Sequence, residues 1–255
     1  MTTQIEPIAA LPRFFEKTGF VSPGDAFNGP FQFARNTKLH TFDFIAQDPK
    51  LQKAFNVVMI LGRQNTGGRE WNDIFPVEEK LKVKNEDEVA IVDVGGGLGQ
   101  VLITLREKFP SLPGKMIVQD LPVVVESIAP ASLPTNISAQ GHDFFAEQPV
   151  KGAKAYYLRA VLHDWPDKQA GQILEKIREA MSEESVVLVN EVTIPEYGVS
   201  LLASQMDLNM MTGFASLERT ERQWRSLLEG AGLELVRIWS EEGVVASVFE
   251  ARLKR

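Results

Sequence analysis

The chain has 255 residues, of which 44% are hydrophobic and 24% are charged, and its formal net charge is −7 at pH 7. This composition is typical of a globular protein with a large core, the acidic balance argues against a nucleic-acid surface, and the absence of cysteine excludes disulfides and thiolate sites. The first residues lack a signal-peptide pattern and no apolar run approaches the ~20 residues of a membrane span, so we expect a cytoplasmic protein that binds neither membrane nor nucleic acid.

The first part of the chain, residues 1–85, is rich in proline and aromatic residues. Residues 37–64 have apolar side chains at helical spacing, and Asp48 followed by Pro49 is a typical helix start. The pattern predicts short helices that form a cap or linker region over 1–85 and a main domain over 86–255. Core packing accounts for most of the aromatic residues, and a few are expected to line a ligand pocket.

From residue 86 onward, apolar runs alternate with amphipathic segments. The predicted strands lie within residues 88–95, 115–122, 136–145, 153–165 and 185–195, with the fourth ending at His163, and the predicted helices begin near residues 100, 123, 167 and 220. Residues 233–253 form a hairpin that is expected to add one antiparallel strand at the edge of the sheet. The alternation predicts an α/β fold with a mostly parallel sheet covered by helices.

A glycine-rich turn, "VDVGGGLGQ" at residues 92–100, separates the first strand from the first helix. Glycines allow a ligand to approach the backbone closely. A dinucleotide fingerprint would need glycine at position 100, which is Gln100. The spacing Gly95-x-Gly97-x-Gly99 after Asp93 is instead typical of enzymes that bind S-adenosylmethionine, with a tight structural turn as the alternative.

Asp120 ends the second predicted strand and is the next acidic residue at a strand end. A carboxylate in this position can accept hydrogen bonds from both ribose hydroxyls, and the alternative is a helix cap. The sequence therefore predicts a nucleoside site beside the glycine-rich turn.

The segment "YYLRAVLHDWPD", residues 156–167, runs from an apolar strand to His163. A neutral imidazole can remove the proton of a phenol or hydroxyl group when an acid fixes its tautomer. Glu191, at the end of the next strand, and Glu218, in a loop before the last helix, are the expected acids. A core histidine or a helix cap is the alternative for His163, while His40 and His142 are expected to be structural.

Six segments occur in the order "DVGGGLGQ", "QDLPVVVES", "GHDFF", "LRAVLHDWPD", "VNEVTIP" and "ERTERQW". Together they resemble the S-adenosylmethionine-dependent small-molecule O-methyltransferases of plants and, more closely, of fungal secondary metabolism. The resemblance covers residues 5–255. It implies a class I methyltransferase fold, a Rossmann-like seven-stranded sheet with a C-terminal antiparallel hairpin. Members usually carry an N-terminal winged-helix dimerisation domain, which we expect to be missing here.

The resemblance also implies roles for single residues. The catalytic residues would be His163, Glu191 and Glu218. The cofactor contacts would be Asp93, Gly95, Gly97, Asp120, Leu121, Asp143, Phe144, Arg159 and Trp165. Apolar candidates for the substrate pocket are Phe33, Met59, Trp71, Met206, Met210 and Phe214.

The expected function is methyl transfer from S-adenosylmethionine to a hydroxyl group of an aromatic or polyketide-like secondary metabolite. No metal is expected, because a histidine base makes a cation unnecessary. One alternative is an enzyme of the same fold with a non-methylating, pericyclase or dehydratase-like reaction. Another is a non-catalytic partner subunit, and either a homodimer or a pairing with another pathway protein is compatible with the sequence.

Overall fold

The computed structural model describes residues 2–64, 70–129, 132–241 and 246–254. The chain forms two compact units. The first consists of residues Met1–Arg69, Leu162–Ala170 and Val192–Trp224, and the second of Glu70–Val161, Gly171–Glu191 and Arg225–Arg255. The predicted division into domains at residue 85 stays a prediction.

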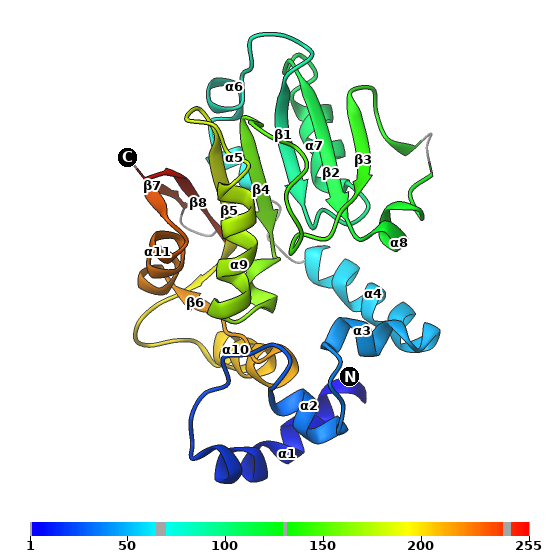
Figure 1. The fold of residues 1–255 in the computed structure, drawn as a ribbon, viewed down its shortest axis with the longest axis vertical. Coiled ribbons are helices and arrows are strands. Elements are labelled where there is room, and N and C mark those ends of the chain that lie inside the picture. Colours follow the sequence, from blue (N-terminus) through cyan, green and yellow to red (C-terminus); the bar gives the residue numbers. More distant parts are fainter. Residues whose placement is uncertain (1, 65–69, 130–131, 242–245, 255) are drawn as a thin grey trace. The chain divides into compact units, whose positions relative to one another are not determined.

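The fold is organised around an eight-stranded sheet in which seven strands follow the order β3-β2-β1-β4-β5-β8-β7 and β6 pairs with β5 (Figure 1). The strands are β1 (Val89–Val94), β2 (Lys115–Asp120), β3 (Ile137–Gly141), β4 (Ala155–Arg159), β5 (Val186–Ile194), β6 (Arg219–Thr220), β7 (Leu233–Trp239) and β8 (Ala246–Leu253). β1 pairs in parallel with β2 and β4, β2 with β3, and β4 with β5. β7 and β8 are antiparallel. This confirms the predicted α/β class and the C-terminal hairpin.

The hairpin differs in one detail from the sequence expectation, because its second strand is not at the edge. β8 lies between β5 and β7, so β7 is the edge strand. The burial of the two strands explains the order. Val248, Phe249 and Ala251 of β8 are fully buried, whereas Val236 of β7 is exposed. The more apolar strand takes the interior position, where both faces are covered.

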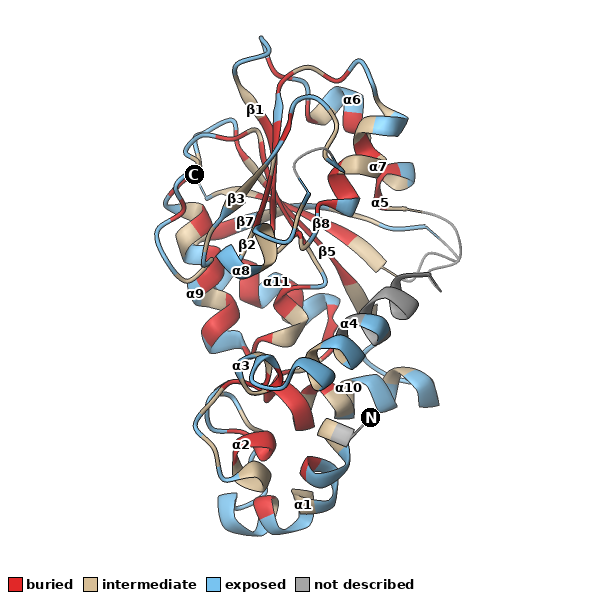
Figure 2. Ribbon diagram, turned by 90° about the vertical axis from the view of Figure 1, so that its right-hand side faces the viewer, coloured by how far each residue is buried: buried red, intermediate tan, exposed pale blue. Residues whose placement is uncertain are grey.

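The hydrophobic core of the second unit lies on the faces of this sheet, and Figure 2 shows the central strands in red, the colour of buried residues. Helices α5 (Trp71–Ile74), α6 (Val77–Lys80), α7 (Gln100–Lys108) and α8 (Pro122–Val125) belong to this unit. α9 (Asp167–Arg178) and α11 (Glu221–Gly230) begin in the first unit's residues and continue in those of the second. Leu102 and Leu105 of α7 pack with Ile91 and Met116 of the neighbouring strands.

The first unit consists mainly of helices. They are α1 (Thr2–Thr18), α2 (Pro30–Arg35), α3 (Thr41–Ala46), α4 (Pro49–Gln64), the short 3-10 helix η2 (Leu162–Asp164) and α10 (Leu201–Phe214). The hydroxyl group of Thr41 donates to the carbonyl of Gly213 and so joins α3 to α10. Within this unit β6 pairs with Thr193 and Ile194, the last residues of β5.

Helix α1 is longer than the short helices predicted for this region, although it contains Pro7 and Pro12. Proline has no N–H group, so Pro7 cannot bond to the carbonyl of Thr3 one turn earlier. Arg35 donates to that carbonyl instead, at 3.5 Å, and its guanidinium also pairs with Glu6 at 2.6 Å. Arg35 of α2 therefore supplies a donor for the Thr3 carbonyl, which Pro7 cannot supply within α1.

None of the helices in the described part of the chain has both the length and the apolar character that a membrane crossing requires.

Candidate active site

The glycine-rich turn lies at the carboxyl end of β1 and is held by the neighbouring strand β2. The backbone N–H groups of Gly95 and Gly96 donate to the carbonyl of Gln119 at 2.8 and 3.0 Å. The N–H of Gly97 donates to Asp120 Oδ2 at 2.8 Å. Gly95 and Gly97 have φ angles of 72° and 61°, a left-handed conformation that favours glycine. The turn is thus a fixed loop with its shape set by backbone hydrogen bonds.

The Asp120 carboxylate faces this loop, and each of its oxygens accepts one backbone hydrogen bond and can accept another. Oδ2 accepts from Gly97, and Oδ1 accepts from the N–H of Leu121 at 2.8 Å. A carboxylate oxygen has two acceptor sites, so each retains room for a hydroxyl donor. A Cβ added at Gly97 would meet no atom within 4 Å, which leaves this side of the loop open. The open backbone beside a carboxylate fits the ribose and amino-acid ends of S-adenosylmethionine.

The opposite side of the loop is closed by Asp93, which is buried in β1. A Cβ added at Gly96 would lie 2.5 Å from Asp93 Oδ2 and 2.7 Å from Val118 Cγ2. The sequence placed Asp93 among the cofactor contacts, and the structure places its carboxylate directly beneath the glycine-rich turn.

Replacing Gly96 with alanine is therefore expected to lower the free energy of unfolding by ~1–3 kcal/mol, the usual cost of overpacking a filled site. Urea denaturation followed by circular dichroism measures the change. Gly171→Ala in α9 is the matched control, since its Cβ would meet no atom within 4 Å and alanine favours a helix by ~0.5–1 kcal/mol over glycine. Equal stability of the two variants would contradict the expectation.

The other predicted cofactor contacts of the second unit lie at the carboxyl ends of its strands. A Cβ added at Gly95 would lie 3.8 Å from the Phe144 ring, so that ring borders the loop. Asp143 is exposed and accepts from the N–H of Phe145 at 3.0 Å. Leu121 is 46% exposed beside Asp120. The structure brings Gly95, Gly97, Asp120 and Phe144 together at one end of the sheet.

Arg159, the last residue of β4, was also predicted to lie near the cofactor. Its Nη1 atom pairs with Glu70 Oε2 at 2.9 Å, and the two side chains are 22% and 37% exposed. The guanidinium is thus partly shielded and oriented by an acid that precedes α5. Sequence reasoning did not identify Glu70, whose position 89 residues earlier gives no signal.

His163 lies in η2, in the first unit, and contacts a buried acid. Its Nδ1 atom is 3.3 Å from Glu218 Oε1, and the Glu218 side chain is only 3% exposed. Its Nε2 atom is 3.7 Å from Asp164 Oδ1, which is longer than a hydrogen bond. The structure therefore brings together two of the three predicted catalytic residues, His163 and Glu218.

The contact with Glu218 determines what the imidazole can do. An ionised carboxylate only accepts hydrogen bonds, so a hydrogen bond between these two atoms requires the His163 tautomer with its proton on Nδ1. Nε2 then presents its lone pair and is the atom that can accept a proton from a hydroxyl group. Glu218 Oε2 is buried and has no hydrogen-bond partner among the described residues.

Glu218 is held from the other side by Asp207 of α10. The backbone N–H of Glu218 donates to Asp207 Oδ1 at 2.8 Å. Burial raises the pKa of Asp207, the hydrogen bond from Glu218 opposes the rise, and the charge of the Glu218 carboxylate adds to it. Asp207 thus holds the backbone of Glu218, the acid that contacts His163.

A buried arginine fixes the segment that carries His163. Arg219 is 0% exposed and donates to the carbonyls of Leu162 and Trp165 at 2.9 and 2.8 Å. It also donates twice to Asp167 Oδ1, at 2.9 and 2.8 Å. Sequence reasoning assigned no role to Arg219. The single signal was the place of Arg219 directly after Glu218.

Glu191, the second predicted acid, lies inside β5 rather than at its end and belongs to the second unit. It is 2% exposed, and its Oε1 atom accepts from the backbone N–H of Val161 at 2.9 Å. Its predicted action on His163 stays a prediction.

Trp165 and two substrate candidates lie in the first unit. Trp165 stacks on the ring of His40, with centroids 4.3 Å apart, and is 6% exposed. Met210 and Phe214 of α10 are buried, and the Phe214 ring lies 5.2 Å from that of Phe42. Trp165 and Phe214 belong to one aromatic cluster with His40 and Phe42, and Trp165 is two residues after His163.

The remaining substrate candidates are dispersed. Phe33 packs against Phe14 of α1 at 5.8 Å, and Met206 is 44% exposed on α10. Trp71 lies in the core of the second unit, 4.5 Å from the ring of Tyr157. Met59 is in α4, and its side chain is outside the described residues.

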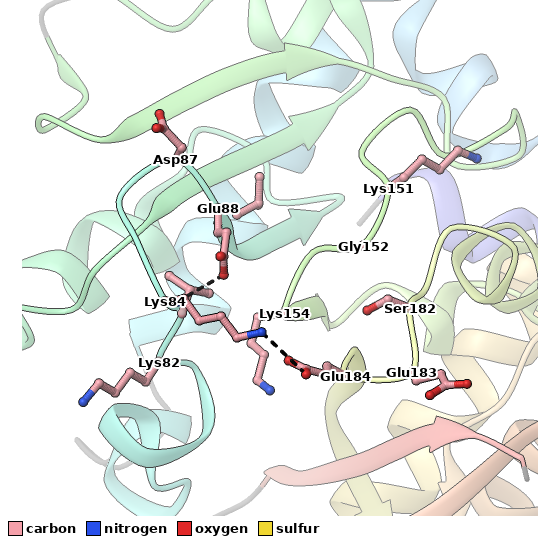
Figure 3. Close-up of a pocket in the computed structure, with 12 residues that line it drawn as sticks. Lys82, Lys84, Asp87, Glu88, Lys151, Gly152, Lys154, Ser182, Glu183 and Glu184 are labelled. Atoms are coloured by element: carbon pink, nitrogen blue, oxygen red, sulfur yellow. Dashed lines mark hydrogen bonds and ion pairs between the residues drawn. The ribbon is translucent and has the colours of Figure 1, made fainter.

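Two further features concern ligands other than the cofactor. Across the described residues, no group of three or more His, Asp or Glu side chains is arranged to hold a metal ion. A hollow of about 540 Å³ lies in the second unit where β1, β4 and β5 begin (Figure 3). It is lined mainly by charged side chains, of which Lys84 and Glu184 form an ion pair at 3.8 Å. This hollow is at the amino ends of the strands, opposite the end that carries the glycine-rich turn.

Comparison with known proteins gives one family. The model of the O-methyltransferase domain matches residues 27–234. Demethylsterigmatocystin 6-O-methyltransferase stcP of Emericella nidulans is 46% identical over 198 residues, which cover 77% of this chain and 94% of that protein. Demethylsterigmatocystin 6-O-methyltransferase of Aspergillus flavus is 40% identical, over 89% of this chain and 57% of that protein.

Solved structures show the same fold over nearly the whole chain. The complex of LepI with SAM has a TM-score of 0.88 and 35% identity, and a structure described as a pericyclic reaction enzyme has a TM-score of 0.87 and 35% identity. OxaC in complex with sinefungin and meleagrin has a TM-score of 0.87 and 32% identity. The chain covers 64% of each of these structures and so spans less than two thirds of their length.

Proposed function

Because this chain belongs to the O-methyltransferase family, we propose that it methylates a hydroxyl group of an aromatic, polyketide-like metabolite with S-adenosylmethionine as methyl donor. Membership confirms the resemblance that the six sequence segments indicated. The observation that carries the proposal is the contact between His163 and the buried Glu218, which leaves Nε2 as a proton acceptor.

The second unit would hold the cofactor. The backbone of Gly95 and Gly97 and the carboxylate of Asp120 suit its amino-acid and ribose parts, and Phe144 suits the adenine ring. When bound, S-adenosylmethionine supplies a methyl group on an already activated sulfonium. Relatives of the same fold were solved with SAM and with SAH, which supports this choice of cofactor.

His163 would act on the acceptor substrate. A phenol has a pKa of ~10, so it is mostly protonated at neutral pH. Nε2 of His163 accepts the phenolic proton, and Glu218 stabilises the resulting imidazolium through Nδ1. We propose Glu191 as the second acid, with its carboxylate fixed by the Val161 N–H. Deprotonation makes the oxygen a competent nucleophile, and alignment of the partners supplies the rest of the rate.

A second function deserves a test because one solved structure at 35% identity is described as a pericyclic reaction enzyme. In this alternative the protein would bind the cofactor but leave its methyl group in place. The His163–Glu218 pair would then move a proton in a rearrangement or dehydration of the substrate.

The test is incubation with S-adenosylmethionine labelled in its methyl group and a panel of phenolic polyketides. Label in the product and a mass gain of one CH2 support methyl transfer. An unchanged mass, or loss of water, together with tight cofactor binding would favour the alternative. Absence of both binding and turnover would favour a non-catalytic subunit, for which light scattering with a second copy or a pathway partner is the next measurement.

Asp120 offers a separate test of the cofactor site. Asp120→Asn is expected to weaken S-adenosylhomocysteine binding by about 10- to 100-fold, because hydrogen bonds to a charged acceptor contribute ~1.5–3 kcal/mol. Titration calorimetry measures the affinity. Glu126→Gln on the same segment is the control, since it removes one exposed negative charge without touching the loop. Unchanged affinity in Asp120→Asn would place the nucleoside elsewhere.

A further inference from the structure

His40 is a buried histidine with a defined tautomer. It is 2% exposed and caps the start of α3, where its Nδ1 atom accepts from the backbone N–H of Phe42 at 3.3 Å. A neutral imidazole with Nδ1 as acceptor carries its proton on Nε2. Burial lowers the pKa of His40 to about 4, so the ring is neutral at pH 7 and Nε2 remains an N–H donor.

This donor has no acceptor in the part of the chain that the structure describes. Nε2 of His40 is buried and has no hydrogen-bond partner among the described residues. A buried donor without a partner costs free energy, and native proteins rarely leave one unless a ligand or water completes it. The capping role fixes only the Nδ1 side of the ring, so it does not explain the other nitrogen.

The surroundings of His40 define what can complete it. The Trp165 ring stacks on the imidazole at 4.3 Å with an interplanar angle of 13°. Phe42, Phe27 and Phe214 lie 5.1, 5.8 and 6.0 Å away, and all are in the first unit. A buried N–H donor beside flat aromatic rings suits an aromatic ligand that carries a carbonyl oxygen. Trp165 also joins the cluster to the segment of His163, two residues earlier.

We propose that Nε2–H of His40 donates to the carbonyl oxygen of an aryl ketone in the acceptor substrate and so selects aromatic ketones that also carry the hydroxyl to be methylated. The inference rests on the proposed function, because that function identifies the molecule bound by His40 as the methyl-accepting substrate. A neutral donor in apolar surroundings favours a neutral acceptor, because it offers no charge to offset the desolvation of a carboxylate or phosphate. The sequence had predicted a purely structural role for His40.

The first test reads the ring directly. The protein has three histidines, so protein labelled with ¹⁵N-histidine gives few ring signals, and His40→Asn assigns those of His40. We expect the Nε2–H tautomer with no titration between pH 6 and 8. In the presence of S-adenosylhomocysteine, 4-hydroxybenzophenone and 1-hydroxyanthraquinone are expected to shift the Nε2–H proton downfield. 4-Benzylphenol, which has CH2 in place of the ketone, is expected to leave it unchanged.

The second test measures selectivity by calorimetry. Wild-type protein is expected to bind 4-hydroxybenzophenone about tenfold more tightly than 4-benzylphenol, the contribution of one buried hydrogen bond. His40→Phe should abolish this preference. His40→Asp keeps an acceptor for the Phe42 N–H but, when ionised, has no donor, so it preserves the helix cap and gives the same comparison if His40→Phe is unstable.

A proton on Nδ1 of His40 would overturn the proposal. So would an Nε2–H signal that neither ketone shifts, or a ketone preference that survives in both variants. None of these readouts requires turnover, so they stay decisive if the protein does not transfer methyl groups. In that case methyl transfer fails in the labelled-cofactor assay while the ketone still shifts the His40 signal.

Discussion

His163→Ala is expected to reduce kcat/KM for methyl transfer by about 10²- to 10⁴-fold, the usual contribution of a general base. The affinity for S-adenosylhomocysteine is expected to stay within about twofold, because the glycine-rich turn and Asp120 belong to other segments. Steady-state kinetics with a phenolic substrate and calorimetry with S-adenosylhomocysteine check the two parts.

The dependence on pH separates a lost base from a damaged fold. A phenol with a pKa near ~10 ionises without help as the pH rises toward that value. The deficit of His163→Ala should therefore shrink with rising pH and should also be smaller for a more acidic, nitro-substituted phenol. A deficit that is the same for all phenols and at every pH would show that His163 does not remove the proton.

Glu218→Gln tests the partner of the base. A glutamine amide can turn its NH2 group toward Nδ1 of His163, which would then act as acceptor and move the imidazole proton to Nε2. The wrong tautomer cannot accept a proton, so the activity is expected to fall by about two orders of magnitude or more while the side chain keeps its volume. Activity near that of wild type would assign the orientation of His163 to another group.

Most of the sheet was predictable because its strands are short apolar runs that end at turn residues. The errors concern the ends of strands, which depend on backbone conformation and strand pairing rather than on the pattern of apolar residues. The fourth strand was predicted to end at His163, but β4 ends at Arg159, because Ala160 has a φ of 50° and leaves the extended conformation. β5 continues past Glu191 because its last residues, Thr193 and Ile194, gain a partner in β6.

The helix α10 escaped prediction for a different reason. Its residues 201–214 are apolar on several sides, with Leu201 and Leu202 exposed and Met210 and Phe214 buried, so no single face stands out. Ser200 accepts from the N–H of Ala203 at 3.2 Å as a helix cap, and this was the available signal.

The candidate site was predictable in its residue types but not in its pairings. Sequence reasoning proposed two acids for His163, and only the fold shows Glu218 at 3.3 Å and Glu191 bound to a backbone N–H. His40 was predicted to have a structural role, because the sequence does not show which of its ring nitrogens has a hydrogen-bond partner. The contact between His163 and Glu218 joins residues that are 55 positions apart in the sequence. Such contacts depend on the tertiary fold, which local sequence patterns do not determine.

Arg219→Met is expected to lower the free energy of unfolding by ~2–4 kcal/mol. The methionine fills the space of the side chain but removes the hydrogen bonds that the guanidinium donates to the carbonyls of Leu162 and Trp165. A hydrogen bond from a charged group contributes ~1.5–3 kcal/mol, and the Leu162 carbonyl keeps the N–H of Trp165 as a donor, at 3.2 Å. The loss of the ion pair with Asp167 adds little to the destabilisation, because the Asp167 side chain is 67% exposed and water replaces the guanidinium. Urea denaturation measures the difference.

Arg222→Met is the matched control, three residues further along the chain. Arg222 also pairs with an acid, Glu196, at 3.0 Å, but its side chain is 78% exposed. Its loss is therefore expected to change stability by less than ~0.5 kcal/mol. Similar effects of the two substitutions would mean that the carbonyls of the His163 segment do not depend on Arg219.

Arg219→Lys separates charge from geometry. Lysine keeps the positive charge, but its single ammonium cannot reach three acceptors that the planar guanidinium contacts at once. If Arg219 positions His163, the lysine variant should lose kcat without a matching change in KM, and the loss should shrink at high pH as it does for His163→Ala. If the arginine serves stability alone, the variant should unfold more easily but keep the wild-type dependence of kcat on pH, since a base in its proper place still removes the phenolic proton.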